Sequence, residues 1–233
     1  MAAAAKRLPL PPARILSLPP RCRRVVPFLP LMTVSSVSYG LDESLFRAIN
    51  LAGTNAVLDL LMAFFSAIAL PYILPFLSLP LWWKGRRELA FDLLVLLVVV
   101  VVVTEALKYA IGRPRPCDAL PGVNLLTPGA CAAEADPAFP SGHASRIFAV
   151  AALLSLTFKW SVRLGSFAVA ILTGVSRIYL GVHWPSDVLG GAVLGVALAF
   201  VFVWLARRLR FYQKLRTRVV EAVARSVQRG TKA

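Results

Sequence analysis

The residues best suited to chemistry lie at positions 176–187, which read Ser-Arg-Ile-Tyr-Leu-Gly-Val-His-Trp-Pro-Ser-Asp. Arg177, His183 and Asp187 stand there beside a long apolar run. The chain has two histidines, and the other, His143, ends the short motif Pro-Ser-Gly-His. Because charged groups at membrane depth are costly and usually functional, we interpret these side chains as parts of one site.

Three cations and one helix start suit a phosphate group. Lys108 and Arg115 belong to the stretch Lys-Tyr-Ala-Ile-Gly-Arg-Pro-Arg-Pro, and Arg177 is the third cation. Guanidinium groups match phosphate oxygens in a two-point fashion. Ser141 and Gly142 precede an apolar segment, where the backbone N–H groups of a helix start favour an anion. This set of residues predicts a phosphate site.

The histidines supply the remaining chemistry. Asp187 can hold the His183 ring in one tautomer and stabilise its cationic form, and His143 can serve as an acid for a departing oxygen. Together with the cations, these groups indicate phosphoryl transfer through a covalent phosphohistidine. A metal site made of both histidines and Asp187 is the chemical alternative. The three cations would repel a divalent ion, and Cys117 and Cys131 lack zinc-type spacing to either histidine, so we predict a metal-free site.

Composition indicates an integral membrane protein. Of 233 residues, 58% are hydrophobic and 16% are charged, whereas soluble domains carry about 25% charged residues. The net charge of +15 comes from basic clusters at the chain ends and between apolar runs, which indicates anionic headgroups and a positive-inside orientation. A nucleic-acid surface would need aromatic interleaving or a matching fold signature, so no nucleic-acid partner is expected.

The apolar runs predict an all-α polytopic bundle of about five transmembrane helices, with an interfacial helix before them. In the interfacial segment 41–51, Asp42 and Glu43 are expected in the first turn. Prolines should kink the first span, and Gly191 and Gly195 should let the last span approach a neighbour closely. The expected spans are residues 56–83, 88–111, 141–158, 164–182 and 185–206.

Charge distribution predicts the domains and the orientation. Residues 1–40 are expected to be a leader, disordered or not translated, with Met32 as the true start; residues 41–206 form the membrane-embedded domain, and 207–233 form a basic, helical cytoplasmic tail. The short basic turns are placed in the cytoplasm. The connection 112–140 and the site then lie on the extracytoplasmic face. Cys117 and Cys131 share that connection, and both a disulfide and two separate thiols remain open.

Two further charged residues lie near the predicted site. Glu105 precedes Lys108 by three residues on one helix face; it either positions that lysine or is satisfied by a neighbouring helix. Arg146 follows His143 by one turn. It is either a contact for a second phosphate or a rim-facing side chain, and the second reading is preferred.

The three stretches resemble the signature of the type 2 phosphatidic acid phosphatase superfamily, which also contains vanadium haloperoxidases: Lys-x6-Arg-Pro, Pro-Ser-Gly-His and Ser-Arg-x5-His-x3-Asp. All three parts match, and the spacing selects Arg115 rather than Arg113. The resemblance implies that His183 attacks phosphorus, Asp187 orients it and His143 protonates the leaving group, with no metal or cofactor. It also implies the phosphate-binding set Lys108, Arg115, Ser141, Gly142 and Arg177.

The opening Leu-Phe-Arg-Ala-Ile-Asn resembles that of the undecaprenyl diphosphate phosphatases, which implies a polyprenyl diphosphate as substrate at the plasma membrane. Phosphatidic acid, phosphatidylglycerophosphate and lipid-A-like phosphates stay open. From other classes, an anion transporter subunit predicts phosphate flux without hydrolysis, and a silent lipid-binding protein predicts no phosphorylated histidine. The lipid substrate and the bilayer are the expected partners, and the oligomeric state is left open.

Overall fold

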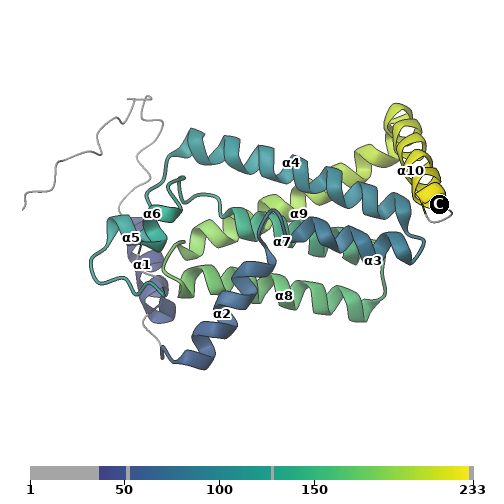
Figure 1. The fold of residues 1–233 in the computed structure, drawn as a ribbon. Helices are drawn as coiled ribbons and strands as arrows, with labels where there is room; N and C mark the ends of the chain where they lie inside the picture. The colour runs from purple at the N-terminus through teal and green to yellow at the C-terminus, as the bar shows by residue number, and fades with distance from the viewer. Residues whose placement is uncertain (1–36, 51–52, 127–128, 231–233) are drawn as a thin grey trace, which may run out of the picture. The chain divides into compact units, whose positions relative to one another are not determined.

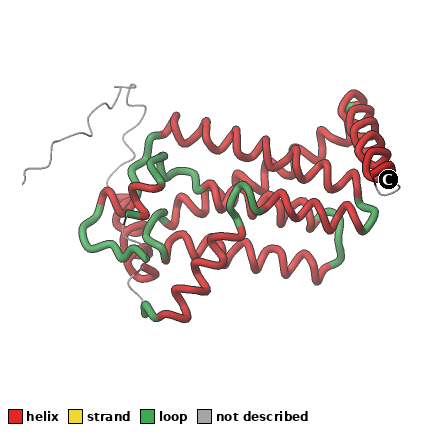
Figure 2. The backbone as a smooth tube through the Cα atoms, in the orientation of Figure 1, coloured by secondary structure: helices red, strands yellow, loops and turns green. Residues whose placement is uncertain are grey.

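The computed structural model describes residues 37–50, 53–126 and 129–230, which form helices joined by turns and contain no β-strand (Figure 2). The predicted all-α class is therefore confirmed for these residues. In chain order the elements are α1 (Val37–Asn50), α2 (Ala56–Ile68), the 3₁₀ helix η1 (Leu74–Leu77), α3 (Ser78–Trp83), α4 (Arg87–Ile111), α5 (Pro116–Ala119), α6 (Ala130–Ala133), α7 (Gly142–Ser155), α8 (Trp160–Tyr179), α9 (Pro185–Arg208) and α10 (Arg210–Gly230).

Helix α7 is the centre of the bundle and packs against α4, α8 and α9 (Figure 1). All its residues are buried except Phe148 and Leu154, which are partly exposed. Small side chains on α7 and glycines on α9 allow this close packing. A Cβ atom on Gly191 would lie 2.6 Å from the carbonyl oxygen of Ser141, and one on Gly195 would overlap that of Ser145. The predicted close approach of the last helix is confirmed.

Among the described residues, three helices are long and apolar enough to cross a membrane: α4, α8 and α9. Helix α7 has 14 residues, so it is about 21 Å long at 1.5 Å per residue, shorter than the roughly 30 Å of a bilayer core. Three of the five predicted spans are thus supported by length. For the segments 56–83 and 141–158, spanning stays a prediction.

The first predicted span is interrupted rather than kinked. Helix α2 ends at Ile68, and the chain turns through residues 69–73 before η1 and α3 continue. Pro71 explains the break, because it lacks an N–H and its ring clashes with the carbonyl four residues earlier. The two halves consequently pack on different neighbours, α2 on α8 and α3 on α4.

The two ends of the described chain also refine the predictions. Helix α1 begins at Val37 and has no acidic residue in its first turn, so placing Asp42 and Glu43 in a first turn was wrong. The predicted start at Met32 lies outside the described residues. The basic tail is helical from Arg210 to Gly230 and packs on α4, where Tyr212 donates a 2.6 Å hydrogen bond to Asp92.

The α7–α9 contact yields a stability prediction. Gly195→Ala should destabilise the fold by about 1–3 kcal/mol, because the new methyl group must push α9 away from the α7 backbone. Thermal unfolding in detergent measures this loss. Gly165→Ala on α8 is the matched control, since a Cβ there meets nothing within 4 Å. Equal melting temperatures for the two variants would contradict the packing argument.

Candidate active site

His183 lies in the short connection between α8 and α9 and is 1% exposed. Its Nδ1 is 3.5 Å from Oδ2 of Asp187, and its Nε2 is 3.3 Å from Nη1 of Arg115. Asp187 is fixed in the first turn of α9, where the same Oδ2 accepts a 2.9 Å hydrogen bond from the backbone N–H of Trp184. The predicted carboxylate–imidazole pair is thus brought together, with Nε2 turned toward a cation.

The three predicted cations converge from different helix ends. Lys108 is in the last turn of α4, Arg177 in the last turn of α8, and Arg115 precedes α5. Arg115 donates a 2.9 Å hydrogen bond from Nη1 to the carbonyl of Val182, beside His183. Arg177 donates one of 2.7 Å to Oγ of Ser66 on α2. The cationic side chains are between 2% and 5% exposed, so the protein itself must compensate their charge.

Two carboxylates from the loop before α7 make this compensation. Glu134 binds Arg177 and lies 2.7 Å from Nη1 of Arg115. Asp136 binds Lys108 and lies 2.9 Å from Nη2 of Arg115. Sequence reasoning missed both acids. The available signal was two carboxylates in the connection predicted to share the face of the three cations.

Arg113, which is not part of the signature, contacts Asp187 and Asp42 rather than the two acids of the loop. Its Nη1 lies 2.6 Å from Oδ1 of Asp187, and its Nη2 lies 2.6 Å from Oδ2 of Asp42 on α1. Asp42 also accepts a 2.9 Å hydrogen bond from the backbone N–H of Ser186 at the start of α9. Arg113 therefore holds the carboxylate that faces His183, and Asp42 holds Arg113.

The start of α7 lies against the start of α9, which carries Asp187. The backbone N–H of Ser141 donates a 3.0 Å hydrogen bond to the carbonyl of Asp187, so this N–H is not free for an anion as the sequence had suggested; Gly142 is buried next to it. Oγ of Ser141 and Nε2 of His143 are buried and find no hydrogen-bond partner among the described residues. Buried polar atoms of this kind commonly mark a place for a ligand or water.

Three charged residues outside the signature also have defined partners. Arg146 is 6% exposed and donates a 3.0 Å hydrogen bond to the carbonyl of Ala69, so the preferred rim-facing reading was wrong. Glu105 lies 3.9 Å from Lys108, farther than Asp136. Its predicted positioning role is at most secondary to that acid. Asp59, another carboxylate in an apolar helix, accepts a 2.6 Å hydrogen bond from the hydroxyl of Tyr179.

Electrostatics keep the His183 ring neutral. Burial lowers its pKa well below 6.5, and the nearby cations Arg177, Arg115 and Lys108 lower it further. The pKa of Asp136 is also lowered, which favours its charged form. Burial raises its pKa, but the hydrogen bond and charge of Lys108 outweigh burial, so its pKa lies below 3.8. A neutral His183 imidazole thus coexists with an ionised Asp136 carboxylate near neutral pH.

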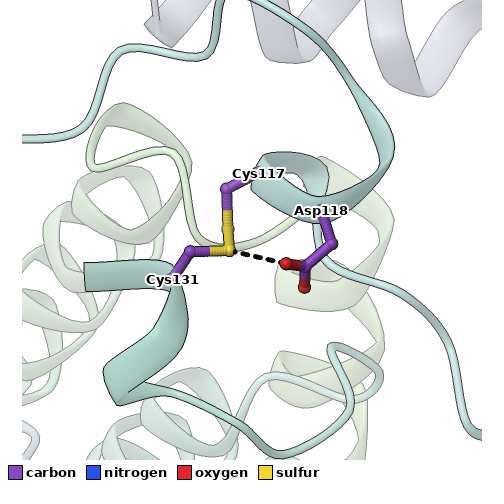
Figure 3. A group of neighbouring side chains, drawn as sticks. All are labelled: Cys117, Asp118 and Cys131. Carbon is purple, nitrogen blue, oxygen red and sulfur yellow. Dashed lines mark hydrogen bonds between the residues drawn. A yellow bond between two sulfur atoms is a disulfide. The ribbon is translucent and has the colours of Figure 1, made fainter. Parts of the chain in front are cut away.

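The connection carrying these acids is closed by a disulfide between Cys117 and Cys131 (Figure 3). Sγ of Cys131 lies 3.1 Å from Oδ1 of Asp118. Among the described residues, Cys117, Asp118 and Cys131 are the one group of three potential metal-binding side chains that lie close together. Its sulfur atoms bond each other, so it offers no thiolate to a metal. The bridge ties α5, next to Arg115, to α6, next to Glu134.

The depressed pKa can be measured directly, because the chain has only two histidines. In untagged His143→Asn protein, imidazole NMR reports His183 alone. Its ring should remain neutral at pH 6.5 and titrate only at lower pH, since burial and the nearby cations both oppose protonation. Free imidazole in the same sample serves as the reference. A titration midpoint at or above 6.5 would contradict this electrostatic description.

Comparisons with known proteins agree with this geometry. Residues 89–211 match the family model described as PAP2 superfamily. An undecaprenyl-diphosphatase of Sulfolobus acidocaldarius is 36% identical over 166 residues, which cover 70% of this chain and 78% of the relative. The putative undecaprenyl-diphosphatase YbjG of Escherichia coli is 33% identical, over 76% of this chain and 89% of the relative.

A solved structure agrees as well. The PAP2-type phosphatidylglycerolphosphate phosphatase of Bacillus subtilis superposes with a TM-score of 0.62 at 25% identity, over 76% of this chain and 90% of that one. The family match covers the segments that carry the three cations and both histidines. This chain therefore belongs to the PAP2 superfamily and is a membrane-embedded hydrolase of phosphate esters.

Proposed function

We propose that this protein hydrolyses a polyprenyl diphosphate, such as undecaprenyl diphosphate, through a phosphohistidine on His183. The observation that carries the proposal is the placement of His183, with Nδ1 3.5 Å from Asp187 and Nε2 3.3 Å from Arg115. The buried cation cluster around it fits a phosphate group. The names of the relatives from Sulfolobus acidocaldarius and Escherichia coli support the choice of substrate.

In the first step, the lone pair of His183 Nε2 attacks phosphorus while the bond from phosphorus to the leaving oxygen breaks. The leaving oxygen takes the electron pair of that bond and a proton from His143. Asp187 stabilises the positive charge that develops on the His183 ring. Lys108, Arg115 and Arg177 balance the charge on the phosphoryl oxygens, with Ser141 and Gly142 at the helix start beside them.

In the second step, water attacks the phosphorus of the phosphohistidine and gives a proton to His143. The phosphorus–nitrogen bond breaks, its electron pair returns to His183, and inorganic phosphate leaves. Both histidines end in their starting forms, so the cycle consumes one water per phosphate released. No step requires a metal ion or a cofactor.

The proposed orientation puts the site on the extracytoplasmic face of the plasma membrane. The basic turn between α3 and α4 and the basic helix α10 lie at the end of the bundle opposite α5 and α6 (Figure 1), which supports a cytoplasmic position for the basic end. The disulfide at the other end supports an oxidising compartment there. In this arrangement α2 with α3, and α7, complete a set of five spans.

His183→Asn should abolish turnover of undecaprenyl diphosphate by purified protein and leave no phosphohistidine, because the nucleophile is gone. Rapid acid-free quenching with ³²P-labelled substrate, followed by mass spectrometry, detects the intermediate on the unmodified protein. Tyr109→Phe is the control, because this exposed side chain adjoins Lys108 in sequence without being part of the site. Full activity of His183→Asn would end the proposal, and activity lost in EDTA and restored by Mg²⁺ would favour a metal mechanism.

His143 can be tested through the leaving group. When a diphosphate is cleaved, the leaving group is a phosphate ester that needs little help from an acid. When phosphatidic acid or phosphatidylglycerophosphate is cleaved, the leaving group is an alcohol. His143→Asn should therefore reduce kcat on the monophosphates by about 10²–10⁴-fold, the usual size of general acid catalysis, and reduce kcat on the diphosphate less. Equal losses on both classes would contradict the role as acid. The same substrate panel ranks diphosphate against monophosphate for the unmodified protein.

A further inference from the structure

The acids of the loop before α7 pair with the same cations that the proposed mechanism assigns to the phosphate group. Between them, Glu134 and Asp136 pair with all three: Glu134 with Arg115 and Arg177, and Asp136 with Arg115 and Lys108. Four carboxylate oxygens thus take the partners that the proposed mechanism assigns to phosphoryl oxygens. A phosphate dianion cannot enter beside them without strong repulsion between like charges.

The side chains of the two acids are partly exposed to solvent, whereas those of the cations are buried. The side chains of Glu134 and Asp136 are 29% and 27% exposed, whereas that of Arg115 is 2% exposed. The loop backbone is anchored independently of the carboxylates, because Nε of Arg115 donates a 3.0 Å hydrogen bond to the carbonyl of Asp136. The N–H of Ala138 also binds the carbonyl of Arg113 at 2.8 Å. Rotation of these two side chains would therefore remove the four carboxylate contacts without moving the loop backbone.

Exchange of the two carboxylates for a phosphate group would keep the buried cations neutralised in both states. Buried cations without a counter-charge are strongly unfavourable, so an empty site needs its own anion. The acids meet this need when no substrate is bound, and a phosphate group meets it when substrate is bound. The disulfide from Cys117 to Cys131 holds α6 beside α5 and keeps the acids close to the site, which raises their effective concentration.

We propose that Glu134 and Asp136 are specificity-determining residues that compete with phosphate for Lys108, Arg115 and Arg177. The inference rests on the proposed function, because it assigns these cations to the phosphate of the substrate. A lipid phosphate overcomes the competition with the added binding energy of its apolar chain. Free inorganic phosphate has no chain, so the acids displace it after hydrolysis and limit product inhibition.

Binding of inorganic phosphate to the full chain in detergent tests the inference without turnover. Glu134→Gln should bind phosphate at least tenfold more tightly than the unmodified protein by isothermal titration, because Arg177 and part of Arg115 lose their internal competitor. The inhibition constant of phosphate in the lipid assay should fall by a similar factor. Asp118→Asn is the matched control, since it removes one negative charge from an exposed residue of the same connection that lies outside these ion pairs.

Phosphate affinity in Glu134→Gln equal to that of Asp118→Asn would overturn the inference. Glu134→Asp guards against misfolding of the glutamine variant, because it keeps the charge but is too short to reach both arginines, and it should give an intermediate affinity. An affinity for Glu134→Asp no tighter than that of the unmodified protein would also count against the proposal. Failure of the proposed function would appear separately, as full lipid turnover by His183→Asn.

Discussion

Three cations buried at one end of a helical bundle impose the constraint that organises this structure. Lys108, Arg115 and Arg177 are almost inaccessible to water, and isolated charges in such surroundings cost several kilocalories per mole each. An anion must therefore be present at every stage. The charges that we propose bind a phosphate group pair here with Glu134 and Asp136. Burial and these charges together lower the pKa of His183, which favours the neutral form of its ring.

The precision of the site comes from close backbone packing rather than from the charged residues themselves. Gly191 and Gly195 bring α9 against the backbone of α7, so the first turns of the two helices meet. The hydrogen bond from the N–H of Ser141 to the carbonyl of Asp187 joins them at that point. The two histidines belong to segments 40 positions apart, and this contact fixes the segments relative to each other.

Hydrophobic periodicity predicted the helices, because it follows the regular geometry of the backbone. The order of the spans across the membrane predicted that the signature residues lie on one face. The acid loop follows no repeat. The partners of Glu134 and Asp136 are set by how a disulfide-linked connection folds back, which only the tertiary structure determines. Arg113 was set aside for a similar reason. Its role depends on Asp42, 71 positions away, and no local pattern joins the two. The break at Pro71 had a local signal, but the separate packing of α2 and α3 did not.

These long-range contacts show that the working unit is larger than the segment matched by the family model. That match begins at residue 89, yet Asp42 on α1 holds Arg113 against Asp187, and Ser66 on α2 binds Arg177. Asp42 is itself buried and also binds the first turn of α9 through Ser186. Helix α1 is therefore joined to the carboxylate that faces His183 by two routes, one through Arg113 and one through the α9 backbone. A chain shortened to the matched segment would keep the signature residues but lose the groups that orient two of them.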